Sequence, residues 1–184
     1  MRIDLGHTDV TSYSEAKPML LEAITPCIED AHAADVILAI HNHGRGWTGE
    51  CFSVNDLVQT IGSAYLRARV CPGNFLLVEK ESDPVASGTA LIPLAGGIFL
   101  KDWRVMDDAE ERGLPFFQVG KHRYIGTSIG KGVIDYARFF KALRMANYSG
   151  MLVLNIEPGT EDDLTAIRES VAFVRSALKK EHYE

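Results

Sequence analysis

Two histidines separated by one asparagine, His41-Asn42-His43, stand between an apolar run and a glycine-containing loop. An imidazole can bind a metal ion or transfer a proton near neutral pH, so this pattern could serve catalysis. If the apolar run is a strand, residues two apart point to the same face, and both rings would extend one site. The same pattern also fits a strand end whose histidines bond to backbone or water. The stretch therefore predicts either the mouth of a pocket or the polar end of a buried strand.

Three further polar clusters follow apolar runs: Cys71-Pro72-Gly73-Asn74, Lys101-Asp102 and Asn155-Ile156-Glu157. Glu157 could be a metal ligand or a base, and burial near a pocket mouth would raise its pKa. The alternative is a carboxylate that bonds to the glycine loop after it. Four separate runs that all end in polar groups favour a shared site.

The residues at the second cluster have structural alternatives as well. Cys71 could bind a soft metal, or act as a nucleophile if a base such as His41 lowered its pKa. Cysteine also packs well at an apolar strand end, with Pro72-Gly73 forming the turn. Asn74 could contact a substrate or cap that turn with its own side chain.

Cationic side chains could hold an anionic or hydroxylated substrate. Lys101 opens one predicted loop, and Lys121-His122-Arg123 lie in the same region of the chain. Such groups pair with phosphate or carboxylate, although a solvated loop has the same composition. The nearby run "GTSIGKG" lacks the spacing of a phosphate-binding loop.

Short strands and helices alternate about five times along the chain. The predicted strands are residues 1–6, 35–42, 66–75, 94–103 and 150–159, and the predicted helices are 14–34, 53–62, 135–146 and 160–178. Ser14, Ser53 and Thr160 are the expected N-caps, and Pro26 is expected to bend or break its helix. The polar segment from Arg104 to Gly132 predicts a long loop.

This alternation favours a parallel sheet with helical crossovers. In such folds the chemistry lies at the carboxyl ends of the strands, where the four polar clusters fall.

Composition limits the class of protein. A net charge of -6 and the absence of a dense Lys/Arg stripe argue against a nucleic acid partner and against an anionic membrane surface. The 3 cysteines have no regular spacing, as expected for reduced thiols. No apolar run is long enough for a membrane span or an export signal. We therefore expect a cytoplasmic protein whose 184 residues form a single domain.

Several motifs resemble the later strands of the xylose isomerase-like TIM barrels, the superfamily of sugar-phosphate isomerases and epimerases. They are "LAIHNHG", "PGNFLL", "IFLKD" and "GKGVIDYARFFKALRMANYSGMLVLNIEPG". A full barrel needs roughly 250 residues. The resemblance therefore implies a partial (β/α)8 TIM barrel of about five βα units, corresponding to strands 4–8, over residues 1–184. The first three units would be lacking.

The resemblance also implies a ligand set for a divalent metal such as Mn, Mg, Zn or Co. The family uses Glu, Asp, His and Glu at the ends of strands five to eight. Here those positions are His41, Cys71, Phe99 and Glu157. Phe99 cannot bind a metal and Cys71 is a poor ligand for Mg²⁺, so the implied metal site is degenerate. His41, Cys71 and Glu157 remain the candidate ligands.

By this resemblance, Glu157 and His41 are the candidate catalytic residues. The candidate substrate-binding residues are His43, Asn74, Lys101, Asp102 and His122. The implied activity is that of a sugar or sugar-phosphate isomerase or epimerase on a small polyhydroxylated carbonyl compound. The alternative is a non-catalytic barrel remnant that serves as a binding or interaction module.

Five parallel strands cannot close a barrel. Two exposed edges and a broad apolar inner face would invite pairing with another molecule. We therefore expect a homodimer.

Overall fold

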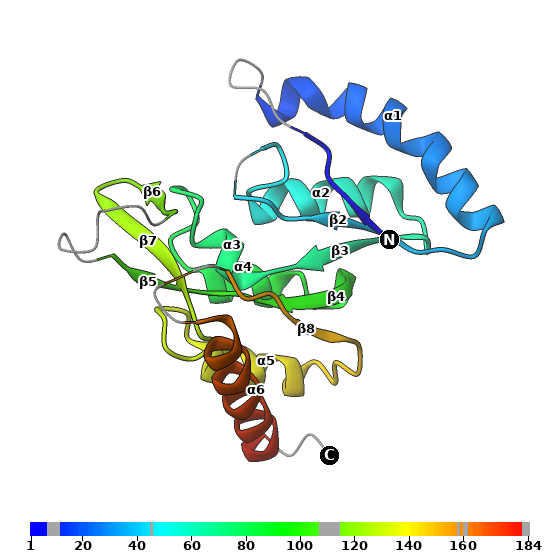
Figure 1. The fold of residues 1–184 in the computed structure, drawn as a ribbon. Coiled ribbons are helices and arrows are strands. Elements are labelled where there is room, and N and C mark those ends of the chain that lie inside the picture. The colour runs from blue at the N-terminus through cyan, green and yellow to red at the C-terminus, as the bar shows by residue number, and fades with distance from the viewer. Residues whose placement is uncertain (7–11, 45, 107–114, 158, 160–161, 182–184) are drawn as a thin grey trace.

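The computed structural model describes residues 1–6, 12–44, 46–106, 115–157, 159 and 162–181. Within these residues, five strands form one parallel sheet in the order β1-β2-β3-β4-β8. The strands are β1 Arg2–Ile3, β2 Leu38–His41, β3 Leu66–Val70, β4 Ala95–Leu100 and β8 Leu152–Leu154. Their order in the sheet is their order in the chain, as in a TIM barrel (Figure 1). The predicted fold class, an α/β partial barrel of five strands, is confirmed.

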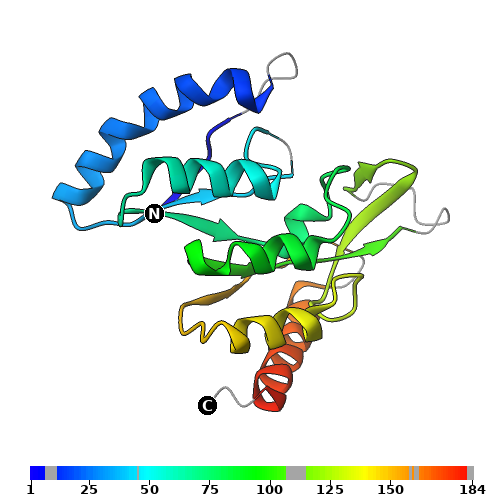
Figure 2. The ribbon, with the colours of Figure 1, turned by 180° about the vertical axis from the view of Figure 1, so that it is seen from behind.

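Helices connect these strands. They are α1 Tyr13–Ala33, α2 Cys51–Ile61, α3 Pro72–Phe75, α4 Pro84–Ala90, the short 3₁₀ helix η1 Ile92–Leu94, α5 Tyr136–Met145 and α6 Asp163–Lys180. The helix α1 lies at one end of the molecule, and α5 and α6 lie together at the other (Figures 1 and 2). Two buried apolar clusters join helices to strands, one around α1, α2 and β2 and the other around β3, β4 and α5.

The two faces of the parallel sheet differ in polarity. Alternate strand residues such as Leu38, Ile40 and Val70 are buried and belong to the apolar clusters. The residues between them face the other way. His41 pairs with Arg69 across β2 and β3, so this inner face carries polar and charged groups. The expected broad apolar inner face is therefore wrong for these central strands.

Helix starts differ from the predicted caps, because a cap depends on local geometry more than on residue type. Ser12, two residues before the expected Ser14, caps α1 and forms a capping box with Glu15. The helix continues through Pro18 and Pro26 rather than breaking. The expected N-cap at Ser53 is wrong, because Ser53 is buried inside α2 and Glu50 precedes the first helical residue.

The cap of the last helix also shifts. Asp162 caps α6, and its Oδ1 accepts from the Thr165 amide at 3.1 Å. The expected cap, Thr160, lies outside the described residues.

A second sheet lies largely within the segment predicted as a long loop, and its first strand begins inside the predicted strand 94–103. Its strands are β5 Asp102–Val105, β6 Phe117–Val119 and β7 His122–Thr127, antiparallel in the order β5-β7-β6. The strands β6 and β7 meet at a tight turn where Gly120 has a positive φ of 54°. A buried Trp103 packs edge-on against Phe117 with ring centroids 5.1 Å apart. Short strands with many polar residues gave this sheet a weak sequence pattern.

Candidate functional site at the strand ends

Two asparagines connect the ends of β2 and β3. The Asn42 side chain donates to the Cys71 carbonyl at 2.9 Å and accepts from the Cys71 amide at 2.8 Å. The Asn74 amide nitrogen lies 2.8 Å from the Asn42 carbonyl and 3.3 Å from His41 Nε2. Because Asn42 and Asn74 are buried, these bonds align the two strand ends. Asn42 was not among the predicted site residues, and its place beside His41 was the available signal.

His41 is buried at the end of β2, with 4% of its surface exposed. Burial, together with the positive charge of Arg69, lowers its pKa to about 3. The imidazole is therefore neutral near pH 7. His43 lies beside it, with the two rings edge-on and their centroids 5.5 Å apart.

Cys71 directly follows β3 and is buried, with 1% of its surface exposed. Burial raises the pKa of its thiol, so the thiolate needed for metal binding or nucleophilic attack is disfavoured. This environment favours the alternative of a packed cysteine beside the strand end over a metal ligand.

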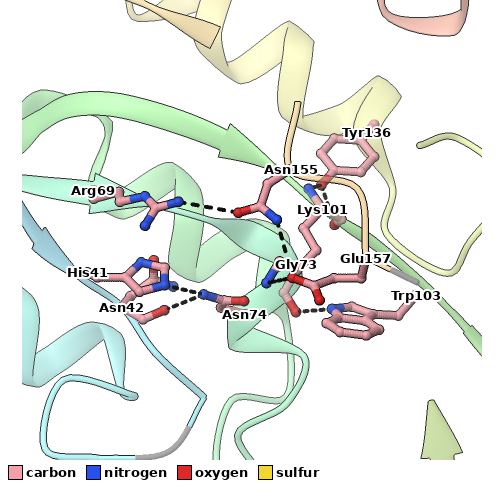
Figure 3. Close-up of polar contacts among 10 residues, drawn as sticks. All are labelled: His41, Asn42, Arg69, Gly73, Asn74, Lys101, Trp103, Tyr136, Asn155 and Glu157. Carbon is pink, nitrogen blue, oxygen red and sulfur yellow. Dashed lines mark hydrogen bonds and ion pairs between the residues drawn. The ribbon is translucent and has the colours of Figure 1, made fainter. Parts of the chain in front are cut away.

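An ion pair joins the ends of β4 and β8. Lys101 Nζ lies 2.5 Å from Glu157 Oε1, and both side chains are largely buried. Asn155 Nδ2 donates to the same Glu157 oxygen at 3.2 Å, and Arg69 Nη2 donates to Asn155 Oδ1 at 3.3 Å. Figure 3 shows this row of contacts from Arg69 to Glu157. Glu157 and Lys101, predicted from separate motifs, therefore lie together.

The backbone around Lys101 is fixed from two sides. Tyr136 Oη donates to the Lys101 carbonyl at 2.6 Å and lies 2.8 Å from the Lys101 amide (Figure 3). Gly73 packs so closely that a Cβ there would lie 2.2 Å from the Lys101 carbonyl oxygen. Trp103 Nε1 donates to the Gly73 carbonyl at 2.7 Å. These contacts hold the end of β4 against the turn after β3.

Asp102 does not face a substrate. Its carboxylate accepts from the backbone amides of Trp103, Gly130, Gly132 and Ile134, at 2.8–3.2 Å. Burial raises its pKa, and these four donors oppose that rise. With 1% of its surface exposed, Asp102 anchors the loop before α5. This placement favours a structural role for Asp102 over the predicted substrate contact.

A small hollow of about 40 Å³ opens beside the strand ends. It is lined by His43, Gly44, Asn74, Leu77, Lys101, Phe117, Gln118 and Val119. Three of the predicted substrate-binding residues, His43, Asn74 and Lys101, therefore share one hollow. The β6 residues were not predicted because their segment was expected to be a loop.

His122 does not reach this hollow. It is exposed at the start of β7 and pairs with Val119 across the tight turn. The structure therefore separates His122 from the other predicted substrate-binding residues.

The described residues do not fit a divalent metal. Among them, no three His, Cys, Asp or Glu side chains lie close enough together to hold one. Glu157 pairs with Lys101, and His41 Nε2 faces the Asn74 amide. The Arg69 guanidinium lies 3.6 Å above the ring of Phe99, which stands where the motif resemblance implies a histidine ligand. The predicted ligand set of His41, Cys71 and Glu157 is therefore not assembled.

These features define an α/β barrel-type protein whose polar residues gather at the carboxyl ends of parallel strands. The model of the xylose isomerase-like TIM barrel family matches residues 5–177. The chain therefore belongs to this family, as its motifs predicted. None of the curated proteins compared matches the chain.

Solved structures show the same fold. A xylose isomerase domain protein from Planctomyces limnophilus is 15% identical, with a TM-score of 0.74 over 97% of this chain and 60% of that one. The IOLI protein with a bound zinc atom is 14% identical, with a TM-score of 0.73 over 100% of this chain and 64% of that one. An L-ribulose 3-epimerase is 14% identical, with a TM-score of 0.71 over 98% of this chain and 62% of that one.

The chain thus spans less than two thirds of each of these structures. One of these structures, that of the IOLI protein, holds a zinc atom. None of the described helices is long and apolar enough to cross a membrane.

Proposed function

We propose that this chain is a sugar or sugar-phosphate isomerase/epimerase-like protein that acts on a small polyhydroxylated carbonyl compound. The observation that carries the proposal is the Lys101–Glu157 ion pair beside a hollow lined by Lys101, His43 and Asn74. Membership of a family whose neighbours include an L-ribulose 3-epimerase supports the substrate class.

In this proposal the substrate carbonyl inserts between the two charged groups. Glu157 removes the proton from the carbon next to the carbonyl, and Lys101 stabilises the negative charge that forms on the carbonyl oxygen. For isomerisation, Glu157 returns the proton to the former carbonyl carbon, while the proton of the adjacent hydroxyl passes to the old carbonyl oxygen. For epimerisation, a solvent water protonates the opposite face of the same carbon, and Glu157 later releases its proton to solvent. His41, neutral at pH 7, positions Asn74 rather than supplying a proton.

Proton exchange tests the chemical step. The chain is incubated in D₂O and chelator with ketopentoses, ketohexoses and their phosphates, and deuterium at the carbon next to the carbonyl is measured by NMR. We expect exchange with at least one compound, and a loss of about 100-fold or more in Glu157→Gln, because the general base is removed. Glu29→Gln, at an exposed position of α1, is the matched control and keeps the exchange rate.

The second candidate is a binding module without catalysis. The absence of a metal-holding cluster among the described side chains favours it. Saturable binding of one of these sugars with no deuterium exchange would support this candidate and reject the enzyme. Neither binding nor exchange would reject both.

A further inference from the structure

His41 and Arg69 form a pair on the inner face of the parallel sheet. They lie opposite each other in β2 and β3, so their side chains share one face (Figure 3). Their exposed fractions are 4% and 6%. This pair is separate from the Lys101–Glu157 ion pair, and Asn155 hydrogen-bonds to both Arg69 and Glu157.

Each member of the pair has a nitrogen without a partner. Among the described residues, His41 Nδ1 and Arg69 Nε are the buried side-chain nitrogen and oxygen atoms that lack a hydrogen bond. Buried polar atoms are nearly always paired in native proteins, and exceptions often mark functional sites. Two such atoms on neighbouring strands point to one missing ligand.

The hydrogen bonds around Asn74 show that His41 Nδ1 is a donor. Asn74 Nδ2 donates to the Asn42 carbonyl, which fixes the orientation of the Asn74 amide. The same nitrogen faces His41 Nε2, so Nε2 must accept. A neutral imidazole has one N–H, which therefore lies on Nδ1.

Arg69 supplies a second donor with a positive charge. Its Nη2 is used by Asn155 and its plane is held over Phe99, which leaves Nε–H available. No carboxylate of the described residues forms an ion pair with Arg69. The site therefore has two donors without acceptors, and one of them belongs to the positively charged Arg69. Such a site attracts an oxyanion and repels a metal cation.

We propose that His41 Nδ1–H and Arg69 Nε–H bind one oxyanion, the carboxylate or phosphate group of the ligand. The proposal deepens the proposed function, on which it rests for the rest of the ligand: an anionic sugar would place its charge here and its carbonyl at Lys101. The anion accepts a hydrogen bond from each of the two donors, and its negative charge offsets the positive charge of Arg69.

Binding of simple anions tests this site without any turnover. Inorganic phosphate and acetate are titrated into the 184-residue chain at constant ionic strength, with chloride as the balancing ion. Side-chain ¹⁵N NMR follows the N–H signals of His41 and Arg69. We expect one saturable site for at least one anion, with both signals moving together.

Variants locate the site. Arg69→Gln is expected to weaken anion binding by about 10-fold or more, because a charge-assisted hydrogen bond is lost. Arg69→Lys keeps the positive charge but lacks the Nε–H donor, so we expect this variant to weaken anion binding as well. Arg67→Gln, two residues earlier in β3, removes the same charge from the same face and is the matched control with wild-type affinity.

Three outcomes would overturn the proposal: no saturable binding of either anion, an equal loss in Arg67→Gln, or full affinity in Arg69→Gln. Binding of phosphate alone indicates a phosphorylated ligand, and binding of acetate indicates a sugar acid; both support the site. Anion binding without deuterium exchange would leave this site standing while rejecting the catalytic function.

Discussion

At the scale of single residues, the environment assigns roles that residue type alone leaves open. His41 and Asp102 both come from motifs that predict chemistry. Burial keeps His41 uncharged, and four backbone amides occupy the Asp102 carboxylate. The remaining reactive candidates are Lys101 and Glu157, which form an ion pair beside the hollow.

The low pKa of His41 predicts a pH-dependent stability. The folded pKa is about 3 and the unfolded value is 6.5, so the unfolded chain binds more protons between these values. The stabilising contribution is present above pH 6.5 and is lost as the pH falls towards 3, by at most about 1.4 kcal/mol per pH unit.

Urea unfolding at several pH values measures this effect. We expect His41→Gln to flatten the decline in the free energy of unfolding below pH 6.5. The exposed His122→Gln keeps the wild-type decline. An unchanged slope in His41→Gln would contradict the assigned environment.

Asp102 is predicted to matter for folding more than for binding. In Asp102→Asn, the amide NH₂ meets backbone N–H groups in place of an acceptor, and we expect a loss of about 2–4 kcal/mol in the free energy of unfolding. Chemical denaturation measures the loss. Asp30→Asn, exposed on α1, serves as the control and should change stability little. A wild-type stability in Asp102→Asn would show that the anchoring bonds contribute little.

At the scale of elements, the site depends on close approach between the end of β4 and the turn after β3. Gly73 permits this approach, because any Cβ would collide with the Lys101 backbone. The bond from Trp103 to the Gly73 carbonyl holds the antiparallel sheet against the same turn. The second sheet therefore helps to shape the hollow, through Phe117, Gln118 and Val119.

Gly73→Ala is predicted to displace the end of β4. The contact is with backbone, which cannot rotate away, so we expect a loss of about 2–4 kcal/mol in stability and weaker ligand binding. Gly97→Ala is the control, since its Cβ would lie 3.4 Å from a Phe99 ring carbon, an ordinary contact. Thermal unfolding compares the two variants, and equal melting temperatures would refute the close-approach argument.

At the scale of the whole molecule, the described sheet has two edges. β1 pairs only with β2, and β8 pairs only with β4. Such edges carry unpaired backbone groups that can join another strand. The charged residues on the central strands exclude a broad apolar inner face as the reason for a partner. The two sheet edges are therefore the remaining reason to expect one.

The homodimer stays a prediction. Sedimentation velocity at micromolar concentration is expected to give a species of twice the chain mass. The exposed Met145 and Met151 lie near the β8 edge in sequence, so Met151→Glu should shift the equilibrium towards monomer. Met19→Glu, on the exposed side of α1, is the control. A wild-type monomer across this concentration range would reject the dimer.

The sequence alone determined the parallel α/β fold and its order of strands. Apolar runs that end in polar clusters are local signals, and the five predicted strands were found near their predicted bounds. The same local signals identified His43, Asn74 and Lys101, which the fold brings to one hollow. The antiparallel sheet was missed because its strands are short and polar, so their stability comes from pairing and from Trp103 rather than from local pattern.

Only the tertiary structure decided what each polar side chain does. The pairing of β2 with β3 places Arg69 beside His41. The loop before α5 surrounds the Asp102 carboxylate with backbone amides, so Asp102 holds that loop in place. Burial and contact between residues far apart in the chain determine charge state and hydrogen bonding, and neither is encoded in residue type or spacing. For this reason the sequence predicted where the polar groups would gather, while the fold decided that cations, in place of metal ligands, occupy the centre of the site.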